Sequence, residues 1–413
     1  MMPDLDVDFV RQHFPAYQGD TLVKGHFFDS AAGSYPCNET IESLQDFYLF
    51  HKVQPGNPFN ISEVGMLKME TSKKRWAEAL GVNTNEVGFG PSTTQNTYVL
   101  ANAFREILKP LDEVIVTNQD HEANTGSIRR ACTASGAVVK EWKVDPQTGM
   151  LDIDALSVLI SDSTRLVCVP HSSNVSGQKN EIKKVCDLAH AVNAWVLVDG
   201  VSYAPHDIPN VDALGADIYV FSLYKVFSVH QGIMVLRDAV MKALPKQGHY
   251  FKESLDVGDL FVPAGPDHAQ IAAADGALDY IETLSAHHGG PVNDLRLACD
   301  YVSDLWRKHE VALVKPLLDF LATNQNVRVI GSMVADKNRC PLVSFAPAND
   351  SPEDLVHILC DQDILLSWGH FYAPRLLEAM NIDSSLGVVR VSMAHYNNLD
   401  DVNALIEKLE GLL

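Results

Sequence analysis

Short runs of valine, isoleucine and leucine alternate with longer amphipathic segments through the middle of this sequence, and this alternation constrains the fold more than any other feature. Each run has the length and the β-branched content of a buried strand, and we expect strands at 113–117, 137–144, 165–170, 195–199, 217–222 and 232–237. Between two of these runs, apolar residues recur at the spacing of one helix face: Ile182, Val185, Leu188, Ala189 and Val192. Strand, helix and strand in this order predict an α/β protein with a mostly parallel central sheet.

The pattern changes after about residue 290, where long helical segments are followed by short β-like runs and a last helix. This change predicts a second, smaller domain, and a chain of 413 residues is long enough to bury two cores. We expect an N-terminal segment, residues 1–25, that packs with the small domain, a large α/β domain, residues 26–288, and a small C-terminal α+β domain, residues 289–413.

The formal net charge of −21 and the isoelectric point near 5.1 restrict the partners that this chain can bind. A surface this acidic repels phosphate backbones and anionic lipids, so nucleic acid and membrane surfaces are not expected partners, and a small-molecule enzyme fits better. The first residues lack the basic and apolar regions of a signal peptide, and no run of about 18 apolar residues could span a membrane. Seven cysteines without paired spacing predict neither a disulfide framework nor a metal site, and they favour a cytoplasmic location.

Polar side chains of different chemistry follow the predicted strands, at the ends where ligands bind in parallel α/β sheets. In chain order, these residues are His121, Asn174, Asp199, Ser222 and Lys225. They follow or end the first, third, fourth and fifth predicted strands. Taken alone, several have an ordinary explanation: Lys225 as a lysine that extends to solvent, Asp199 as a turn or cap residue, His121 as a hydrogen-bonded polar residue at a strand end, and Asn174 as a turn former.

Together, these side chains suggest a carbonyl cofactor such as pyridoxal phosphate. A lysine in apolar surroundings loses proton affinity and can form an imine, and a carboxylate at the end of a buried strand can keep a pyridine nitrogen protonated. Residues 87–91 predict a glycine-containing turn, after which Ser92, Thr93 and Thr94 open an apolar helix. Backbone N–H groups and the positive end of a helix dipole suit a phosphate. The alternative explanation of Thr93 is an ordinary helix cap.

Several motifs follow one another along nearly the whole chain: "HFFDSAAGSYP" from residue 26, "STTQNT" from 92, "DHEAN" from 120, "HSSNVSG" from 171, "VLVDGVSYAPH" from 196, "GADIYVFSLYK" from 215 and "GVVRVSMAHYNN" from 387. In this order they resemble the class V aminotransferase family of fold-type I pyridoxal-phosphate enzymes, in particular its cysteine-desulfurase-like branch. The resemblance implies the fold-type I architecture, pyridoxal 5'-phosphate as the cofactor, an amino acid or amine as the substrate, and a homodimer.

The resemblance also implies roles for individual residues at the cofactor. Lys225 matches the lysine that carries the cofactor as a Schiff base, Asp199 matches the partner of the pyridine nitrogen, and His121 would lie over the cofactor ring. These three are the expected catalytic residues. The other expected cofactor-binding residues are Asn174 at the ring hydroxyl, Thr93, Thr94 and Ser222 at the phosphate, and Ser202.

On the substrate side, Arg390 matches the arginine that binds the α-carboxylate, and a guanidinium group suits a carboxylate well. Ala31 and Tyr372 are expected to be the other substrate-binding residues. Tyr372 is also a departure from the family, because residues 365–377 resemble the stretch in which desulfurases carry a mobile catalytic cysteine. A phenol cannot store sulfur as a persulfide, and the nearest cysteine in sequence is Cys360.

Three other positions differ from the family pattern. Tyr224 stands where histidine is common, Ser202 where glutamine is common, and Pro266 where a hydroxyl residue often reaches the phosphate of the neighbouring subunit. These differences do not change the prediction of the cofactor, but they leave the identity of the substrate open.

We therefore predict a pyridoxal-phosphate enzyme that acts at Cα of an amino acid or a related amine, with Lys225 as the general base. Transamination is preferred because the cysteine needed for one alternative reaction is missing. A cysteine-independent C–S lyase acting by β-elimination and a racemase or epimerase stay open, since the motifs serve all three. A non-catalytic member of the fold that only binds a ligand is a further alternative, although it would not need both Lys225 and Arg390.

Overall fold

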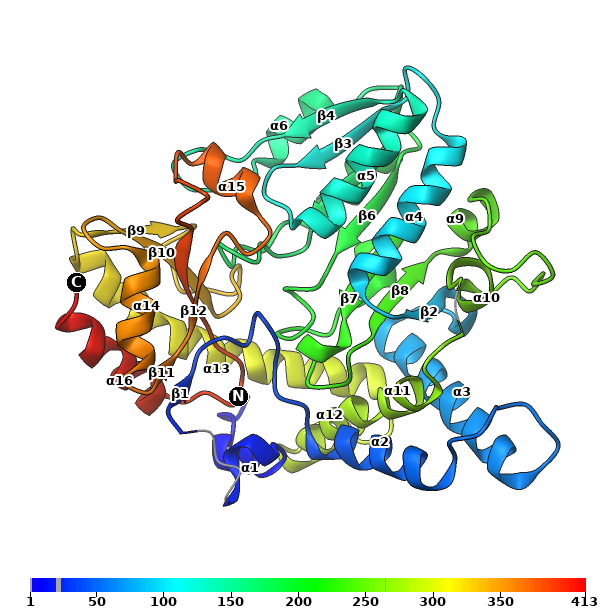
Figure 1. Ribbon diagram of the computed structural model, residues 1–413, viewed down its shortest axis with the longest axis horizontal. Helices are drawn as coiled ribbons and strands as arrows, with labels where there is room; N and C mark the ends of the chain where they lie inside the picture. Colours follow the sequence, from blue (N-terminus) through cyan, green and yellow to red (C-terminus); the bar gives the residue numbers. More distant parts are fainter. Residues whose placement is uncertain (1, 20–23, 264) are drawn as a thin grey trace.

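A seven-stranded sheet lies at the centre of the computed structural model, which describes residues 2–19, 24–263 and 265–413 (Figure 1). From one edge to the other, the strands are β2 (Val87–Gly90), β8 (Gly232–Leu236), β7 (Ile218–Ser222), β6 (Trp195–Asp199), β5 (Thr164–Pro170), β3 (Glu113–Thr117) and β4 (Val138–Trp142). The strands from β7 to β4 run parallel, whereas β8 runs antiparallel to both of its neighbours. The expected α/β architecture with a mostly parallel sheet is confirmed.

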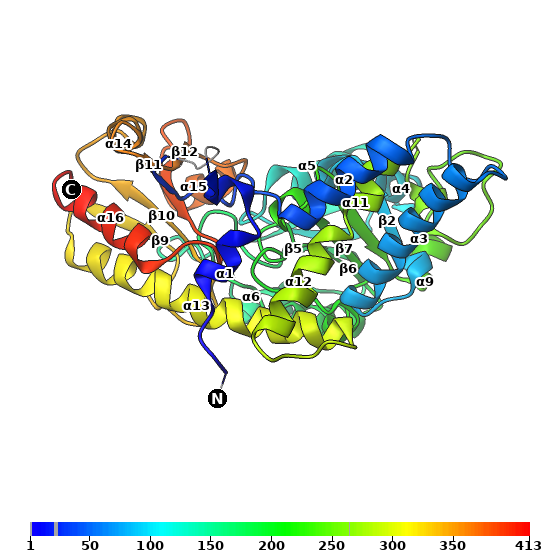
Figure 2. The ribbon, with the colours of Figure 1, turned by 90° about the horizontal axis from the view of Figure 1, so that it is seen from below.

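Alternate residues of the central strands are buried on opposite faces of this sheet, which gives three layers. In β6, Val196 and Val198 join the core on one face, and Leu197 joins the core on the other. Helices α4 (Thr93–Ile107) and α5 (Glu122–Ser135) cover the face that contains Leu197. Helices α3 (Asn60–Leu80), α7 (Ile182–His190) and α12 (Gly276–His287) contribute to the other core, and Figures 1 and 2 show the layers from two directions.

The predicted strands differ from the observed strands mainly at their ends. The runs 113–117 and 195–199 match β3 and β6 in full. The run 137–144 is too long, because β4 ends at Trp142 and Val144 makes only an isolated bridge with Leu151. The turn predicted at residues 87–91 is also wrong in part, since residues up to Gly90 form the edge strand β2. This strand contains two glycines in four residues, a composition that gives a weak strand signal.

A second, four-stranded sheet follows in the C-terminal part of the chain. Its antiparallel strands are, in order, β12 (Ser367–Gly369), β13 (Val388–Ser392), β10 (Leu342–Pro347) and β9 (Val327–Ile330). Helices α13 (Leu295–Thr323), α14 (Pro352–Cys360) and α16 (Leu399–Glu410) share its apolar core. The long helix α13 extends from beside α12 to α16 and so connects the two bodies (Figure 2). The α+β character of this part agrees with the prediction, and the domain boundaries stay predictions.

The N-terminal residues contact both bodies. In helix α1 (Val7–Gln12), Arg11 lies 2.7 Å from Asp401 of α16, while the backbone N–H of Asp6 donates to His288 Nε2 beside the end of α12 at 3.0 Å. Strand β1 (His26–Phe27) then pairs in parallel with β11 (Ile364–Leu365). Within the predicted N-terminal segment, residues 1 and 20–23 lie outside the described residues. None of the helices in the described ranges combines the length and hydropathy of a membrane span.

Candidate active site

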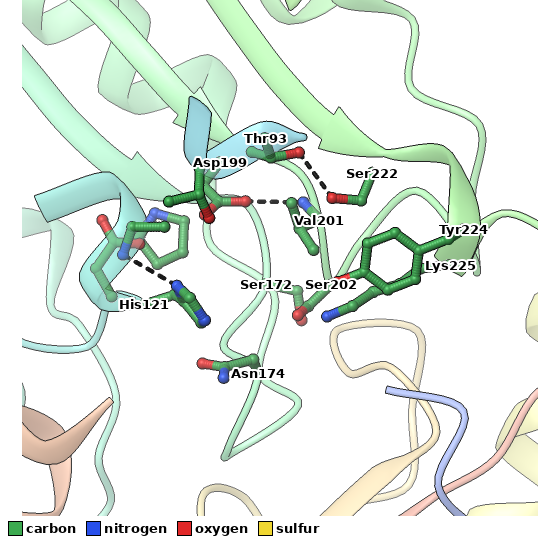
Figure 3. A pocket seen from close by; sticks show the side chains of 14 residues that line it. Thr93, His121, Ser172, Asn174, Asp199, Val201, Ser202, Ser222, Tyr224 and Lys225 are labelled. Atoms are coloured by element: carbon green, nitrogen blue, oxygen red, sulfur yellow. Dashed lines mark hydrogen bonds between the residues drawn. The ribbon is translucent and has the colours of Figure 1, made fainter. Parts of the chain in front are cut away.

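A cavity lies at the carboxyl ends of the parallel strands and gathers most of the predicted site residues (Figure 3). Eight of them line it: Thr93, Thr94, His121, Asn174, Asp199, Ser202, Ser222 and Lys225. The other lining residues are Asp120, Ala123, Pro170, Ser172, Val201 and Tyr224. The side chains come from the ends of β3, β5, β6 and β7 and from the start of α4, as expected where parallel strands end at one edge.

Lys225 ends a single 3-10 turn, Leu223–Lys225, that directly follows β7, and only 8% of its surface is exposed. Burial and, to a smaller extent, the nearby Arg390 guanidinium together lower the pKa of Lys225 to about 8, against the opposing charge of Asp199. An amine with this pKa is partly neutral near physiological pH, and the neutral amine is the nucleophilic form.

Asp199 is the last residue of β6 and accepts a hydrogen bond from the backbone N–H of Val201 at 2.9 Å. Burial raises the pKa of Asp199 to about 6, and the Val201 N–H and Lys225 oppose this rise. Asp120 is a second buried carboxyl in the cavity, and burial together with the charge of Asp199 raises its pKa well above the usual range. Lys225 favours the anion of Asp199, whereas the charge of Asp199 favours the protonated form of Asp120.

His121 is the N-cap of α5, and its Nδ1 accepts a hydrogen bond from the backbone N–H of Ala123 at 3.0 Å (Figure 3). This contact assigns the proton of the neutral ring to Nε2. Burial, followed by the charges of Lys225 and Arg390, lowers the pKa of His121 to about 4. His121 is therefore neutral at physiological pH and can donate from Nε2.

The start of α4 forms a cradle suited to an anion. Ser92, and not Thr93, is the N-cap of this helix, since its Oγ accepts from the backbone N–H of Gln95 at 3.1 Å. The Thr93 hydroxyl is instead 2.7 Å from the Ser222 hydroxyl. A Cβ on Gly232 of β8 would lie 2.5 Å from the backbone of Ser92 and Thr93, so the close approach of β8 to this helix start requires glycine.

Arg390 lies outside the cavity lining but is joined to it through Asn174. It projects from β13, is 3% exposed, and donates from Nη1 to the Asn174 carbonyl oxygen and from Nη2 to Asp29 Oδ1, both at 3.2 Å. The buried Nε–H has no partner among the described residues. The ring of Phe371 lies 3.8 Å from the guanidinium carbon. An arginine with a free, buried donor can bind a carboxylate.

The two remaining predicted residues also lie beside these groups. The backbone N–H of Ala31 donates to Ser392 Oγ at 2.9 Å, two residues beyond Arg390 on β13. Tyr372 is 66% exposed, and its ring centroid lies 5.1 Å from that of His121. Tyr372 and Arg390 thus contact residues of the cavity lining, while Ala31 contacts the strand that carries Arg390, and none of the three is part of the lining.

Sequence reasoning missed several neighbours of the predicted residues. Asp120 precedes His121 and could have been found by extending that strand-end motif by one residue, whereas Tyr224, which precedes Lys225, was noted only as a departure from the family pattern. Phe371 gave no such signal, because its ring reaches Arg390 of β13 from the left-handed turn that follows the neighbouring strand β12.

The cavity fits a phosphate-bearing carbonyl cofactor. It presents a buried amine, a buried carboxylate, a neutral imidazole, and a helix start with two hydroxyls to one space. Each group supplies one of the contacts that such a cofactor needs.

Comparisons with known proteins agree with this description. The sequence matches the aminotransferase class-V family model over residues 26–252 and 293–405. It is 32% identical over 416 residues to the aminotransferase-like protein FGM3 of Gibberella zeae, with 98% of each chain covered. It is 28% identical over 429 residues to the cysteine desulfurase-like protein ustD of Aspergillus flavus, covering 99% of this chain and 91% of that one. The apo cysteine desulfurase of Thermococcus onnurineus NA1 has the same fold, with a TM-score of 0.87 and 22% identity over 100% of this chain and 98% of that one.

Proposed function

Because this chain belongs to the aminotransferase class-V family of pyridoxal-phosphate-dependent enzymes, we propose that it transfers an amino group from Cα of an amino acid or a related amine. The family and the cofactor expected from the motifs are confirmed, whereas the reaction and the residue roles below are proposals. The observation that carries the proposal is the presence of a buried amine, Lys225, and a buried carboxylate, Asp199, in one cavity.

We assign the cofactor contacts as follows. The start of α4 and the hydroxyls of Thr93, Thr94 and Ser222 would hold the phosphate. Asp199 would pair with the pyridine nitrogen, while Asn174 and Ser202 would lie along the ring edge. When bound, pyridoxal phosphate supplies a carbonyl that condenses with amines and a ring that accepts the electrons left at Cα.

Lys225 and His121 are the groups that would move or hold protons. Lys225, partly neutral because of its lowered pKa, would take the proton from Cα of the substrate. The atom to which Lys225 returns this proton decides between transamination and racemisation. His121, with its Nε2–H directed away from the helix start, would donate a hydrogen bond or a proton above the cofactor.

Arg390 would bind the substrate carboxylate, using the Nε–H that has no other partner in the described part of the chain. Its two other hydrogen bonds fix the guanidinium plane before the substrate arrives. Ala31 and Tyr372 would border the same space.

The thiols of the chain support a reaction other than persulfide-forming desulfuration. In the stretch that resembles the cysteine-bearing segment of desulfurases, this chain has Tyr372, and residues 365–377 contain no thiol. Six cysteines are buried, and burial raises the pKa of each: Cys37, Cys132, Cys168, Cys186, Cys299 and Cys340. The remaining one, Cys360, is partly buried and points toward the Leu366 carbonyl oxygen.

A C–S lyase acting by β-elimination is the second candidate. The orientation of His121 favours it, because an Nε2–H above the cofactor can protonate a leaving group at Cβ. Such a lyase needs no cysteine of its own.

Product analysis separates these reactions. The purified, cofactor-loaded protein is incubated with cysteine and a panel of other amino acids, and sulfide, pyruvate, ammonia and protein persulfide are measured. Stoichiometric conversion of the bound cofactor to its amine form, reversed by a 2-oxo acid, would support transamination. Equimolar sulfide, pyruvate and ammonia without persulfide would support the lyase. Persulfide on Cys360 or on another thiol would contradict both.

We also propose a homodimer in a reducing compartment such as the cytoplasm. Nine large apolar side chains between residues 41 and 67 are exposed, on α2 (Asn38–Phe50), α3 and the loop between them: Ile41, Tyr48, Leu49, Phe50, Val53, Phe59, Ile61, Met66 and Leu67. This concentration of exposed apolar side chains in one segment of the protomer supports contact with a second copy. All seven cysteines are unpaired, which supports a reducing location.

A further inference from the structure

Two consecutive residues beside the site have left-handed backbone conformations: Phe371 with φ of 49° and Tyr372 with φ of 58°. Neither is glycine, and this region is disfavoured for such residues because Cβ crowds the backbone. Strain of this kind persists only where the surrounding structure imposes it, and it gathers at functional sites. The segment of residues 370–373, which we call the lid, therefore needs contacts that hold it.

Two backbone carbonyls of the lid are bound by residues of the large body. Asn174 Nδ2 donates to the Phe371 carbonyl oxygen at 2.7 Å, and the backbone N–H of Glu122 donates to the Tyr372 carbonyl oxygen at 2.7 Å. Glu122 is the first residue of α5, where backbone N–H groups have no partner within the helix. The lid thus supplies the partner that this N–H needs.

The side chain of Glu122 holds the lid a second time. Its Oε2 lies 2.7 Å from Nη1 of Arg375, which follows the lid as the second residue of α15 (Pro374–Ala379). A Cβ on Gly126 would collide with the Glu122 carboxylate, so this glycine leaves room for the carboxylate along the first turn of α5. The backbone N–H of Glu122 therefore holds Tyr372 near the C-terminal end of the lid, and its carboxylate holds Arg375 just beyond that end.

The lid covers two groups of the proposed active site. The Phe371 ring lies 3.8 Å from the Arg390 guanidinium carbon, and the Tyr372 ring lies 5.1 Å from the His121 ring, centre to centre. Covering the guanidinium face excludes water, and a charge attracts a carboxylate more strongly when less water surrounds it.

We propose that Glu122 and Arg375 are positioning residues that keep the lid closed, so that Phe371 covers Arg390 and Tyr372 lies beside His121 when an amino acid binds. This inference rests on the proposed function, because it takes Arg390 as the carboxylate-binding group. Breaking the ion pair lowers the fraction of molecules with a closed lid, and the apparent affinity for the substrate falls by the same fraction.

The test compares Glu122→Gln, Arg375→Gln and the double variant, all loaded with cofactor. Hydrogen–deuterium exchange should accelerate in the peptides that contain Glu122 and Tyr372, because the Glu122 N–H is protected only while the lid is closed. KM for an amino acid should rise about two- to fivefold, the range that a partly exposed ion pair can supply, while kcat changes little. The double variant should show no larger effect than either single variant, since all three remove the same interaction.

Arg165→Gln is the matched control, since it removes an Arg–Asp pair, to Asp112 at 3.1 Å, at the opposite end of the sheet. It should alter neither KM nor exchange at Glu122. Unchanged exchange in both single variants, additive effects in the double variant, or the same rise in KM for Arg165→Gln would each overturn the proposal. The exchange experiment needs no turnover, so it distinguishes an incorrect lid assignment from an incorrect reaction assignment.

Discussion

The hydroxyl groups of Thr93 and Ser222 lie 2.7 Å apart, although 129 residues separate them in the chain. Their contact joins the first residue of α4 to the last residue of β7 beside the cavity (Figure 3). One of these hydroxyls donates to the other, which leaves the second hydroxyl free to donate to a phosphate oxygen at the positive end of the helix. This pair is therefore the most direct target for a test of the phosphate site.

Thr93→Val keeps the shape of the side chain and removes its hydroxyl. We expect the dissociation constant for pyridoxal phosphate to rise about tenfold or more, since a hydrogen bond to a charged group contributes about 1.5–3 kcal/mol. Fluorescence titration of the cofactor-free protein measures this change. Thr133→Val, which alters an exposed hydroxyl bonded to the Arg129 carbonyl oxygen on α5, is the control. Equal affinities for both variants would remove Thr93 from the phosphate site.

Lys225 should react with the cofactor at a lower pH than an exposed lysine. Because burial lowers the pKa of Lys225 from 10.5 to about 8, the fraction of Lys225 that is neutral increases as the pH rises past about 8. The rate of cofactor capture should therefore increase with pH and level off about one unit above this pKa, as followed by stopped-flow absorbance. Borohydride reduction should then fix the cofactor to the peptide that contains Lys225. Labelling of a different lysine would show that the assignment is wrong.

His121 should make the protein sensitive to acid. The folded protein takes up a proton at His121 only near pH 4, whereas the unfolded chain does so near 6.5. The contribution of neutral His121 to the free energy of unfolding is therefore fully present above pH 6.5 and is lost as the pH falls toward 4. The unfolding free energy of the wild type should therefore fall between pH 7 and pH 5. For His121→Asn, this fall should be smaller by about 1–2 kcal/mol, as measured by urea denaturation. An unchanged pH dependence would contradict the neutral state of His121.

Arg390→Ala should reduce kcat/KM for an amino acid. The corresponding loss of transition-state stabilisation should be about 1.5–3 kcal/mol or more, the range for hydrogen bonds to charged groups. The corresponding amine without a carboxylate is the matched substrate, and its kcat/KM should fall much less. Steady-state kinetics with both substrates decide the point, because equal losses would exclude a carboxylate contact.

Phe50→Asp should weaken the proposed dimer, because it places a charge at a side chain that is 63% exposed among the exposed apolar side chains of residues 41–67. Light scattering should show more monomer at micromolar concentration. Val158→Asp, at a side chain that is 84% exposed on α6 (Ile153–Leu159), should leave the mass unchanged. A fully active wild-type monomer at this concentration would exclude the dimer.

The strand-end pattern was enough to predict which side chains meet in the cavity, because parallel strands end at one edge. Asp199 and Lys225 follow from this rule alone. Arg390 does not, since it projects from a strand of the second sheet, and only the family resemblance placed it beside the site. The stacking of Phe371 on Arg390 could not be predicted at all, because it depends on a left-handed backbone in residues that rarely adopt one.

The place of β8 between β2 and β7 also has a consequence for the order in which the protein matures. Helix α4 is synthesised early, but Gly232 of β8, made about 140 residues later, packs against its first residues. A nascent chain that has just been extended past Lys225 offers the amine without a finished phosphate cradle. The helix start that lines the cavity can therefore take its final position only after β8 has inserted into the sheet between β2 and β7.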